Sequence, residues 1–147
     1  MEKSEWARRT AQEFKTRSAQ KAEEDASRLE EQKTRKQWAS RLWSELREAF
    51  KERAEIFNAA LGEEMLTWEC SGPSAFHLSR KDIAGRVKAT FQQGTGEVRI
   101  EVLGRAVPLE VALDHRTGKY RLESPSGEPA EPEDLAETLI AEFLGTI

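Results

Sequence analysis

Residues 86–123 read RVKATFQQGTGEVRIEVLGRAVPLEVALDHRTGKYRLE, and this stretch decides the fold. Apolar and polar residues alternate through four runs, which begin at Val87, Val98, Val107 and Tyr120. Alternation with a period of two and one polar face is typical of half-buried antiparallel strands. The segments between the runs are short and contain glycine, as hairpin turns do. The stretch therefore predicts four consecutive antiparallel strands that share one apolar face.

The middle hairpin gives a register that can be tested. If Gly104 and Arg105 form a two-residue turn, Ile100 faces Leu109 on the apolar side. The same scheme sets three opposite charges across neighbouring strands, namely Lys88 with Glu101, Arg99 with Glu110 and Asp114 with Lys119. Such pairs contribute from a few tenths to about 1 kcal/mol each, so they serve mainly as a check on the register. Pro108 has no N–H to donate to a ladder, so we expect a bulge or a frayed end there.

Composition indicates one domain with a real core and a very polar segment. The 147 residues are 34% charged and 37% hydrophobic, with a net charge of −4. No run approaches the roughly 20 apolar residues of a membrane span, and the charged N-terminus lacks the apolar core of a signal peptide. Cys70 is the one cysteine and has no internal disulfide partner. We therefore expect a cytoplasmic protein that does not bind membranes.

The N-terminal part is predicted to be helical. Residues 1–61 contain neither glycine nor proline and are rich in strong helix formers. Residues 1–36 are interpreted as a polar helical arm, since Leu29 is the only large apolar residue between positions 15 and 37. Local support is expected from acid–base pairs four residues apart, namely Glu5–Arg9, Glu13–Arg17, Glu24–Arg28 and Glu31–Arg35. The pattern leaves open whether residues 1–61 form one helix or a helical hairpin.

Trp6 and Phe14 form a small apolar tip on this arm. One interpretation is a frayed end, and the other is a point at which a second chain docks. The charges of residues 1–60 are nearly balanced, with 14 Lys and Arg against 12 Asp and Glu. This balance argues against nucleic-acid binding by the helix.

Residues 37–147 are predicted to form a two-layer α+β domain. The apolar residues of the helix from 38 to 61 cover an arc of roughly 140°, wider than the stripe of about 100° that one core contact requires. One edge is expected to cover the sheet and the other to meet the C-terminal helix or a second copy of the chain. The candidate partner-binding residues are Trp6, Phe14, Trp38, Trp43, Phe50 and Phe57.

The remaining segments complete the predicted fold. Residues 66–70 alternate and read as a strand that turns back through 71–73, with Cys70 as a buried thiol on the apolar side. Pro132 is placed to begin a short amphipathic C-terminal helix. The expected class is α+β, with an antiparallel sheet of five or six strands covered on one face by a long N-terminal helix and this short one.

No pattern of catalytic or metal-binding residues stands out. His77 is expected on a polar strand face and His115 in a turn, both solvated. No Cys and His cluster has the spacing of a metal site. Gly94, Thr95 and Gly96 precede a strand rather than a helix N-terminus, so they do not form a phosphate loop. We expect no enzyme, no catalytic residues, no metal and no cofactor.

Two function classes remain. The first is a non-enzymatic interaction or structural protein that forms a homodimer, in the manner of a coiled coil, through its long N-terminal helix. The alternative is a small-molecule binding module with an apolar pocket between helices and sheet, lined by Trp38, Trp43 and Trp68.

Overall fold

A computed structural model describes residues 2–146. Its elements are α1 (Lys3–Leu61), β1 (Leu66–Cys70), β2 (Ala75–Arg80), β3 (Arg86–Phe91), β4 (Val98–Val102), β5 (Arg105–Asp114), β6 (Lys119–Glu123) and α2 (Pro132–Phe143). The predicted α+β class, the long helix, the antiparallel sheet and the short C-terminal helix are confirmed. Internal contacts divide the chain into a first unit, Met1–Thr34, and a second unit, Arg35–Ile147. Independent folding of residues 37–147 stays a prediction.

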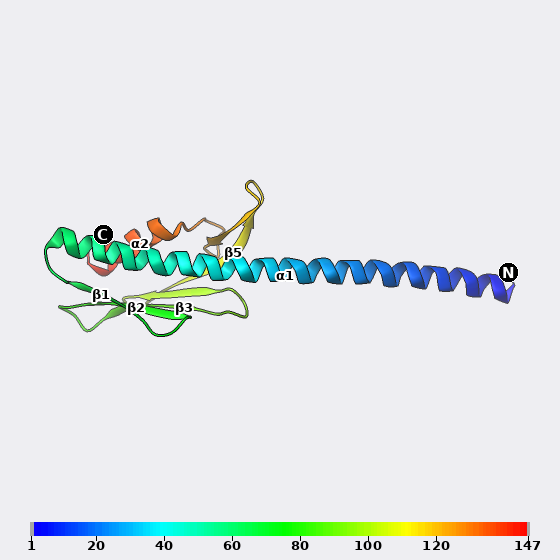
Figure 1. Cartoon of the computed structure of the whole chain (residues 1–147), viewed down its shortest axis with the longest axis horizontal. Helices are drawn as coiled ribbons and strands as arrows, with labels where there is room; N and C mark the ends of the chain where they lie inside the picture. The colour runs from blue at the N-terminus through cyan, green and yellow to red at the C-terminus, as the bar shows by residue number, and fades with distance from the viewer. Residues whose placement is uncertain (1, 147) are drawn as a thin grey trace. The chain divides into compact units, whose positions relative to one another are not determined.

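The second unit contains one six-stranded antiparallel sheet in the order β1-β2-β3-β4-β5-β6. β5 changes partner along its length, because Arg105 to Leu109 pair with β4 whereas Glu110 to Asp114 pair with β6. Figure 1 shows the β5–β6 hairpin turning away from the plane of β1–β3. The meander therefore bends around the helix rather than remaining flat.

The register of the middle hairpin differs from the prediction by two residues. Leu103 and Gly104 form the turn, with φ of 49° and 82°, and Val102 pairs with Arg105. Arg99 consequently lies opposite Pro108 instead of Glu110. A shift of two keeps every side chain on its predicted face, so the burial pattern alone does not reveal the error. The predicted pairs Lys88–Glu101 and Asp114–Lys119 are confirmed.

Pro108 causes neither a bulge nor a frayed end, which corrects the prediction. The two-residue turn makes Val102 and Arg105 a hydrogen-bonded pair, and such pairs alternate with non-hydrogen-bonded ones along the ladder. Arg99 and Pro108 fall at a non-hydrogen-bonded position, so the proline withholds no bond from β4.

The core lies between α1 and the apolar face of the sheet. Figure 1 shows α2 and the C-terminal half of α1 on the same side of β1–β3. Trp43 stacks on Phe76 and Phe91, with ring centroids 5.4 and 5.5 Å apart, and its indole N–H donates to the Pro73 carbonyl at 2.8 Å. Phe50 lies 5.2 Å from the same Phe76 ring. The buried residues of α1 are Ala39, Leu42, Trp43, Leu46, Ala49, Phe50 and Ala54.

α2 covers the second edge of the wide apolar arc and begins at Pro132, as predicted. Its inner face buries Ala136, Leu139, Ile140 and Phe143. Arginines from three elements hold it at the rim. Arg53 of α1 donates to Glu137 at 2.9 Å, Arg105 of β5 pairs with Glu142, and Arg80 of β2 donates to the Phe143 carbonyl at 2.8 Å.

We expect Phe50→Ala to reduce the free energy of unfolding by about 3–5 kcal/mol, because the aromatic side chain is 0% exposed and its removal leaves a cavity. Ile56→Ala is the matched control, since Ile56 lies on the same helix and is 53% exposed. Chemical denaturation followed by circular dichroism measures both variants. Equal losses in the two would contradict the packing described for α1.

Candidate functional site

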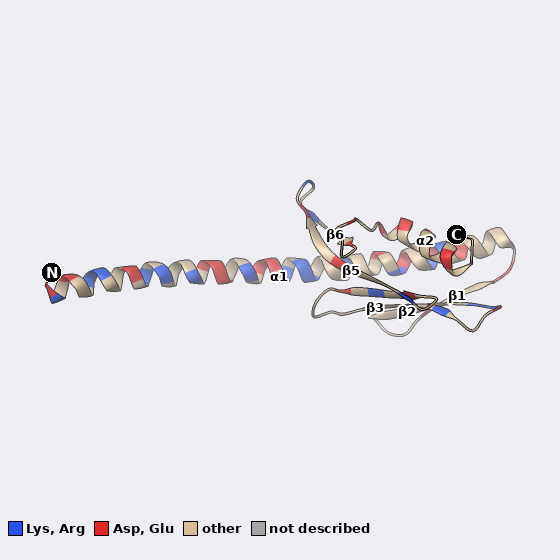
Figure 2. Cartoon of the chain, turned by 180° about the vertical axis from the view of Figure 1, so that it is seen from behind, with Lys and Arg blue, Asp and Glu red and all other residues tan. Residues whose placement is uncertain are grey.

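The first unit is a helix without a buried face. Every described residue from Glu2 to Thr34 is exposed, including Trp6 at 61%, Phe14 at 71% and Leu29 at 66%. The four predicted acid–base pairs in this segment do not form. Among the described residues of α1, Arg41–Glu45, at 3.4 Å, is the one pair of this spacing at ion-pair distance. Figure 2 shows the charged residues distributed along this helix. Its surface is therefore open to another molecule.

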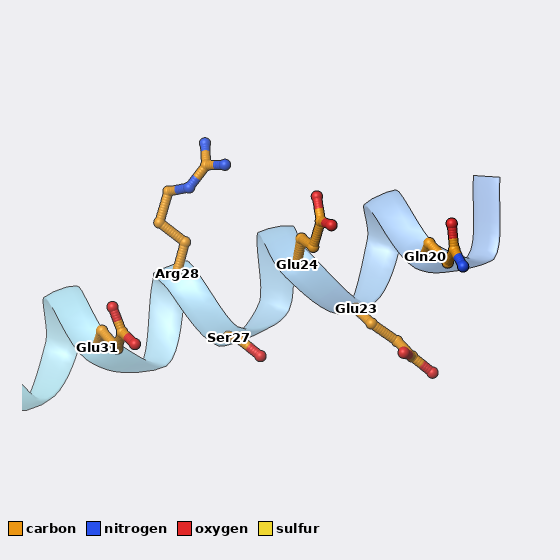
Figure 3. Close-up of a pocket in the computed structure, with 6 residues that line it drawn as sticks. All are labelled: Gln20, Glu23, Glu24, Ser27, Arg28 and Glu31. Atoms are coloured by element: carbon orange, nitrogen blue, oxygen red, sulfur yellow. The ribbon is translucent and has the colours of Figure 1, made fainter. Parts of the chain in front are cut away.

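A shallow hollow of about 600 Å³ follows this helix and is lined by Gln20, Glu23, Glu24, Ser27, Arg28 and Glu31. Figure 3 shows all six side chains projecting from one helix, with Glu24 and Arg28 on one side and Glu23 on the other. A surface with a single wall does not enclose a small ligand.

The predicted partner-binding residues fall into two groups. Trp6 and Phe14 are exposed in the first unit. Trp43 and Phe50 are 3% and 0% exposed, so they present no surface to a second chain. Trp38 and Phe57 are half-buried at the edge of the second unit. The arc is thus covered by the sheet and α2 of the same chain as far as Ala54, whereas Ile56 and Leu61 at its end are 53% and 47% exposed.

The three tryptophans of the predicted pocket do not line one cavity. Trp43 is in the core, and Trp68 packs on the Phe76 ring that Trp43 also contacts, with the Trp68 and Phe76 ring centroids 6.0 Å apart. Lys51 lies over the Trp68 ring at 5.6 Å, and the Trp68 Nε1 atom is buried without a hydrogen-bond partner. Trp38 instead forms a pair with Tyr120, with centroids 6.3 Å apart. Only Trp38 of the three borders a described groove.

This groove is formed by segments far apart in the sequence. Its volume is about 350 Å³, and its lining includes Trp38, Arg41, Leu42, Glu45, Asp114, Thr117, Lys119, Tyr120, Arg121, Leu122, Ala130, Glu131 and Pro132. The Arg41 guanidinium lies 5.0 Å from the centre of the Trp38 ring. Aromatic rings beside charges of both signs can hold a planar group with a polar edge. Sequence reasoning singled out Trp38 but not Tyr120, which was treated only as a strand residue.

Asp114 orders the β5–β6 turn at the margin of the groove. Its carboxylate accepts a hydrogen bond from the Arg116 backbone N–H at 3.0 Å and one from the Thr117 hydroxyl at 3.3 Å. Arg121 lies 3.6 Å away. The Arg116 N–H is the main cause that lowers the pKa of Asp114 from its usual value, and the two arginines add to it.

A second polar cluster lies on the outer face of β1 and β2. His77 Nε2 lies 3.0 Å from Glu69, and His77 Nδ1 lies 3.3 Å from the Ser71 hydroxyl. The His77 side chain is 18% exposed, so the expectation of a solvated histidine is wrong. The Glu69 side chain is 61% exposed, and the cluster is a cross-strand pair in contact with water rather than a desolvated catalytic triad.

Cys70 also departs from the prediction, because it is exposed rather than buried. Its thiol donates to the Gly72 carbonyl at 2.8 Å, at the turn that follows β1. The apolar side of β1 is covered near Leu66, which is 2% exposed, but not at the far end of the strand.

We expect acid to weaken the β5–β6 turn through Asp114. Its pKa is lower in the folded chain than in the unfolded chain, so the unfolded chain takes up the proton first as pH falls. The carboxylate's contribution is therefore fully present above the pKa of about 3.9 of an aspartate in the unfolded chain, and it is lost as pH falls through the lower pKa of the folded chain. Unfolding curves of the unmodified chain and of Asp114→Asn should differ at neutral pH and converge in acid. A difference independent of pH would contradict this assignment.

No family model, curated protein or solved structure matches this chain. Neither helix described within residues 2–146 contains a segment long and apolar enough to cross a membrane. Over the same residues, no group of three or more His, Cys, Asp and Glu side chains is placed to hold a metal ion. The exposed helix of the first unit and the Trp38–Tyr120 groove are therefore the surfaces from which a function is inferred.

Proposed function

We propose that this protein is a non-enzymatic, cytoplasmic interaction protein that forms a homodimer through α1, with the first unit carrying the contact. One observation supports this proposal above the others. The exposed large apolar residues of the first unit, Trp6, Phe14 and Leu29, have no cover in the chain, whereas the second unit buries its own core.

The stability of the helix in the first unit also favours a partner. A helix that buries no face depends on intrinsic propensity and on weak local pairs, and most helices in proteins are stabilised by packing. The predicted local ion pairs do not form in this segment. A second molecule along the helix would supply the missing packing and would cover the exposed aromatic residues.

We expect light scattering to give twice the mass of one chain at high protein concentration. Replacing Trp6, Phe14 and Leu29 with alanine should weaken the dimer by at least about tenfold, because their apolar surface would no longer be buried on association. The matched control replaces Leu103 and Leu113, which are 58% and 39% exposed in the second unit, and should leave the dimer unchanged.

A chain lacking residues 1–34 should remain folded and monomeric. If the full chain is monomeric at every concentration, self-association is excluded. If the shortened chain still forms dimers, the contact lies in the second unit instead.

The second candidate is a small-molecule binding module that uses the Trp38–Tyr120 groove. The observation that favours it is a half-buried aromatic pair beside a volume of about 350 Å³, which lies within the usual range of ligand sites. This candidate replaces the pocket predicted between three tryptophans, because Trp43 is inaccessible.

Titration with a panel of small planar ligands tests the second candidate. A ligand of the groove should change tryptophan fluorescence in a saturable manner, and Trp38→Phe should abolish that change. Trp6→Phe is the control and should preserve it, since Trp6 is in the first unit. Responses that persist in Trp38→Phe, or a flat response across the panel, would exclude the groove as the binding site.

A further inference from the structure

The charges of the first unit are divided into two successive blocks of opposite sign. The basic block, residues 8–21, carries Arg8, Arg9, Lys15, Arg17 and Lys21 against one acid, Glu13. The acidic block, residues 22–31, carries Glu23, Glu24, Asp25, Glu30 and Glu31 against one base, Arg28. All of these residues are exposed. Their charges are therefore available to a partner that presents the opposite order.

Each block also contains one exposed large apolar residue. Phe14 lies in the basic block and Leu29 in the acidic block, with exposures of 71% and 66%. They are 15 residues apart, which places them about 60° from each other around a helix that turns about 100° per residue. The two side chains therefore share one side of the helix.

We infer that two copies of this chain pair through their first units in antiparallel orientation, with the overlap centred near residues 20–22. This inference rests on the proposed self-association and names its geometry. In this arrangement Lys15 and Arg17 of each copy lie along the acidic block of the other, whereas Arg8 and Arg9 come near its Lys33. Lys15 comes opposite Asp25 of the second copy, and Arg17 comes opposite Glu24.

Charge decides between the two possible orientations. A parallel pair in register sets each block against the same block of its mate, so that like charges oppose one another. The antiparallel pair joins opposite blocks twice, once on each side of the two-fold axis. It also brings Phe14 within about three residues of Leu29 of the second copy, and does so twice.

The two kinds of contact have different roles. Exposed ion pairs are individually weak and are screened by salt, so they mainly select the partner and its direction. Burial of the Phe14 and Leu29 side chains adds affinity that depends much less on salt. Figure 3 shows that Glu24 and Arg28 project from the same side of the helix.

Reversal of whole charge blocks in the full chain tests this inference. One variant reverses the basic block by Lys15→Glu, Arg17→Glu and Lys21→Glu. A second reverses the acidic block by Glu23→Lys, Glu24→Lys and Asp25→Lys. Each should weaken the dimer at least tenfold in sedimentation equilibrium. The variant with all six substitutions should recover the dimer, and it has the same net charge as the unmodified chain. Circular dichroism checks that helix content is unchanged.

Mixing the six-fold variant with the unmodified chain then reports the relative orientation of the two paired helices. The six-fold variant and the unmodified chain should not form mixed dimers, because an antiparallel pair of the two sets like blocks together. A spin label at Ser4→Cys, with Cys70→Ser, should give an interchain distance of roughly 50 Å, whereas a parallel pair would give a short one. Mixed dimers, a short distance or a six-fold variant that stays monomeric would overturn the antiparallel arrangement.

The outcomes also separate this inference from the proposal on which it rests. If all the variants form dimers as strongly as the unmodified chain, the block arrangement is wrong while self-association stands. If the unmodified chain is monomeric, self-association itself fails.

Discussion

The second unit depends on one contact, in which the apolar face of α1 packs on the apolar face of the sheet. Leu46 and Phe50 of the helix are 0% exposed, as is Phe76 of β2. A sheet with one apolar face and a helix with one apolar stripe each require a cover, and here each covers the other. α2 then closes the remaining edge of the helix. The bend of β5 follows from the same constraint, because it carries β6 toward the side of the sheet on which α1 and α2 lie.

The same helix changes character along its length. Every described residue up to Gln37 is exposed, whereas seven residues from Ala39 to Ala54 are buried. Packing within the chain therefore supports only the later segment. The earlier segment contains strong helix formers, which favour a helix. Its charges lie in blocks of opposite sign and are exposed. This contrast makes the first unit the region whose surface is left open to another molecule.

Local periodicity predicted the strands and their faces well, but it did not place the turn between β4 and β5. The two candidate turns, Gly104-Arg105 and Leu103-Gly104, share Gly104, which can adopt a positive φ, and the competing registers differ by two residues. Both put Val98, Ile100 and Val102 on the apolar side, so the hydrophobic pattern is equally satisfied. In the observed register Leu103 is part of the turn and adopts a φ of 49°, which is uncommon for a residue with a side chain. The Trp38–Tyr120 groove was likewise missed because its walls come from α1, β6 and the segment before α2.

The sequence by itself determined the fold class, the extent of the N-terminal helical region, the faces of the strands and the division of charge along the first unit, whereas the structure decided that the helical region is one helix, Lys3–Leu61. These features depend on neighbours within a few residues, through turn chemistry and the repeat of helix or strand. The tertiary structure decided which apolar residues are available to other molecules. Trp43 lies in the core, whereas Trp38 lies at an edge of the domain. Cys70 is exposed although it follows the apolar alternation of β1. The physical reason is that burial depends on what a distant segment brings into contact, and alternation reports only the side on which a residue lies.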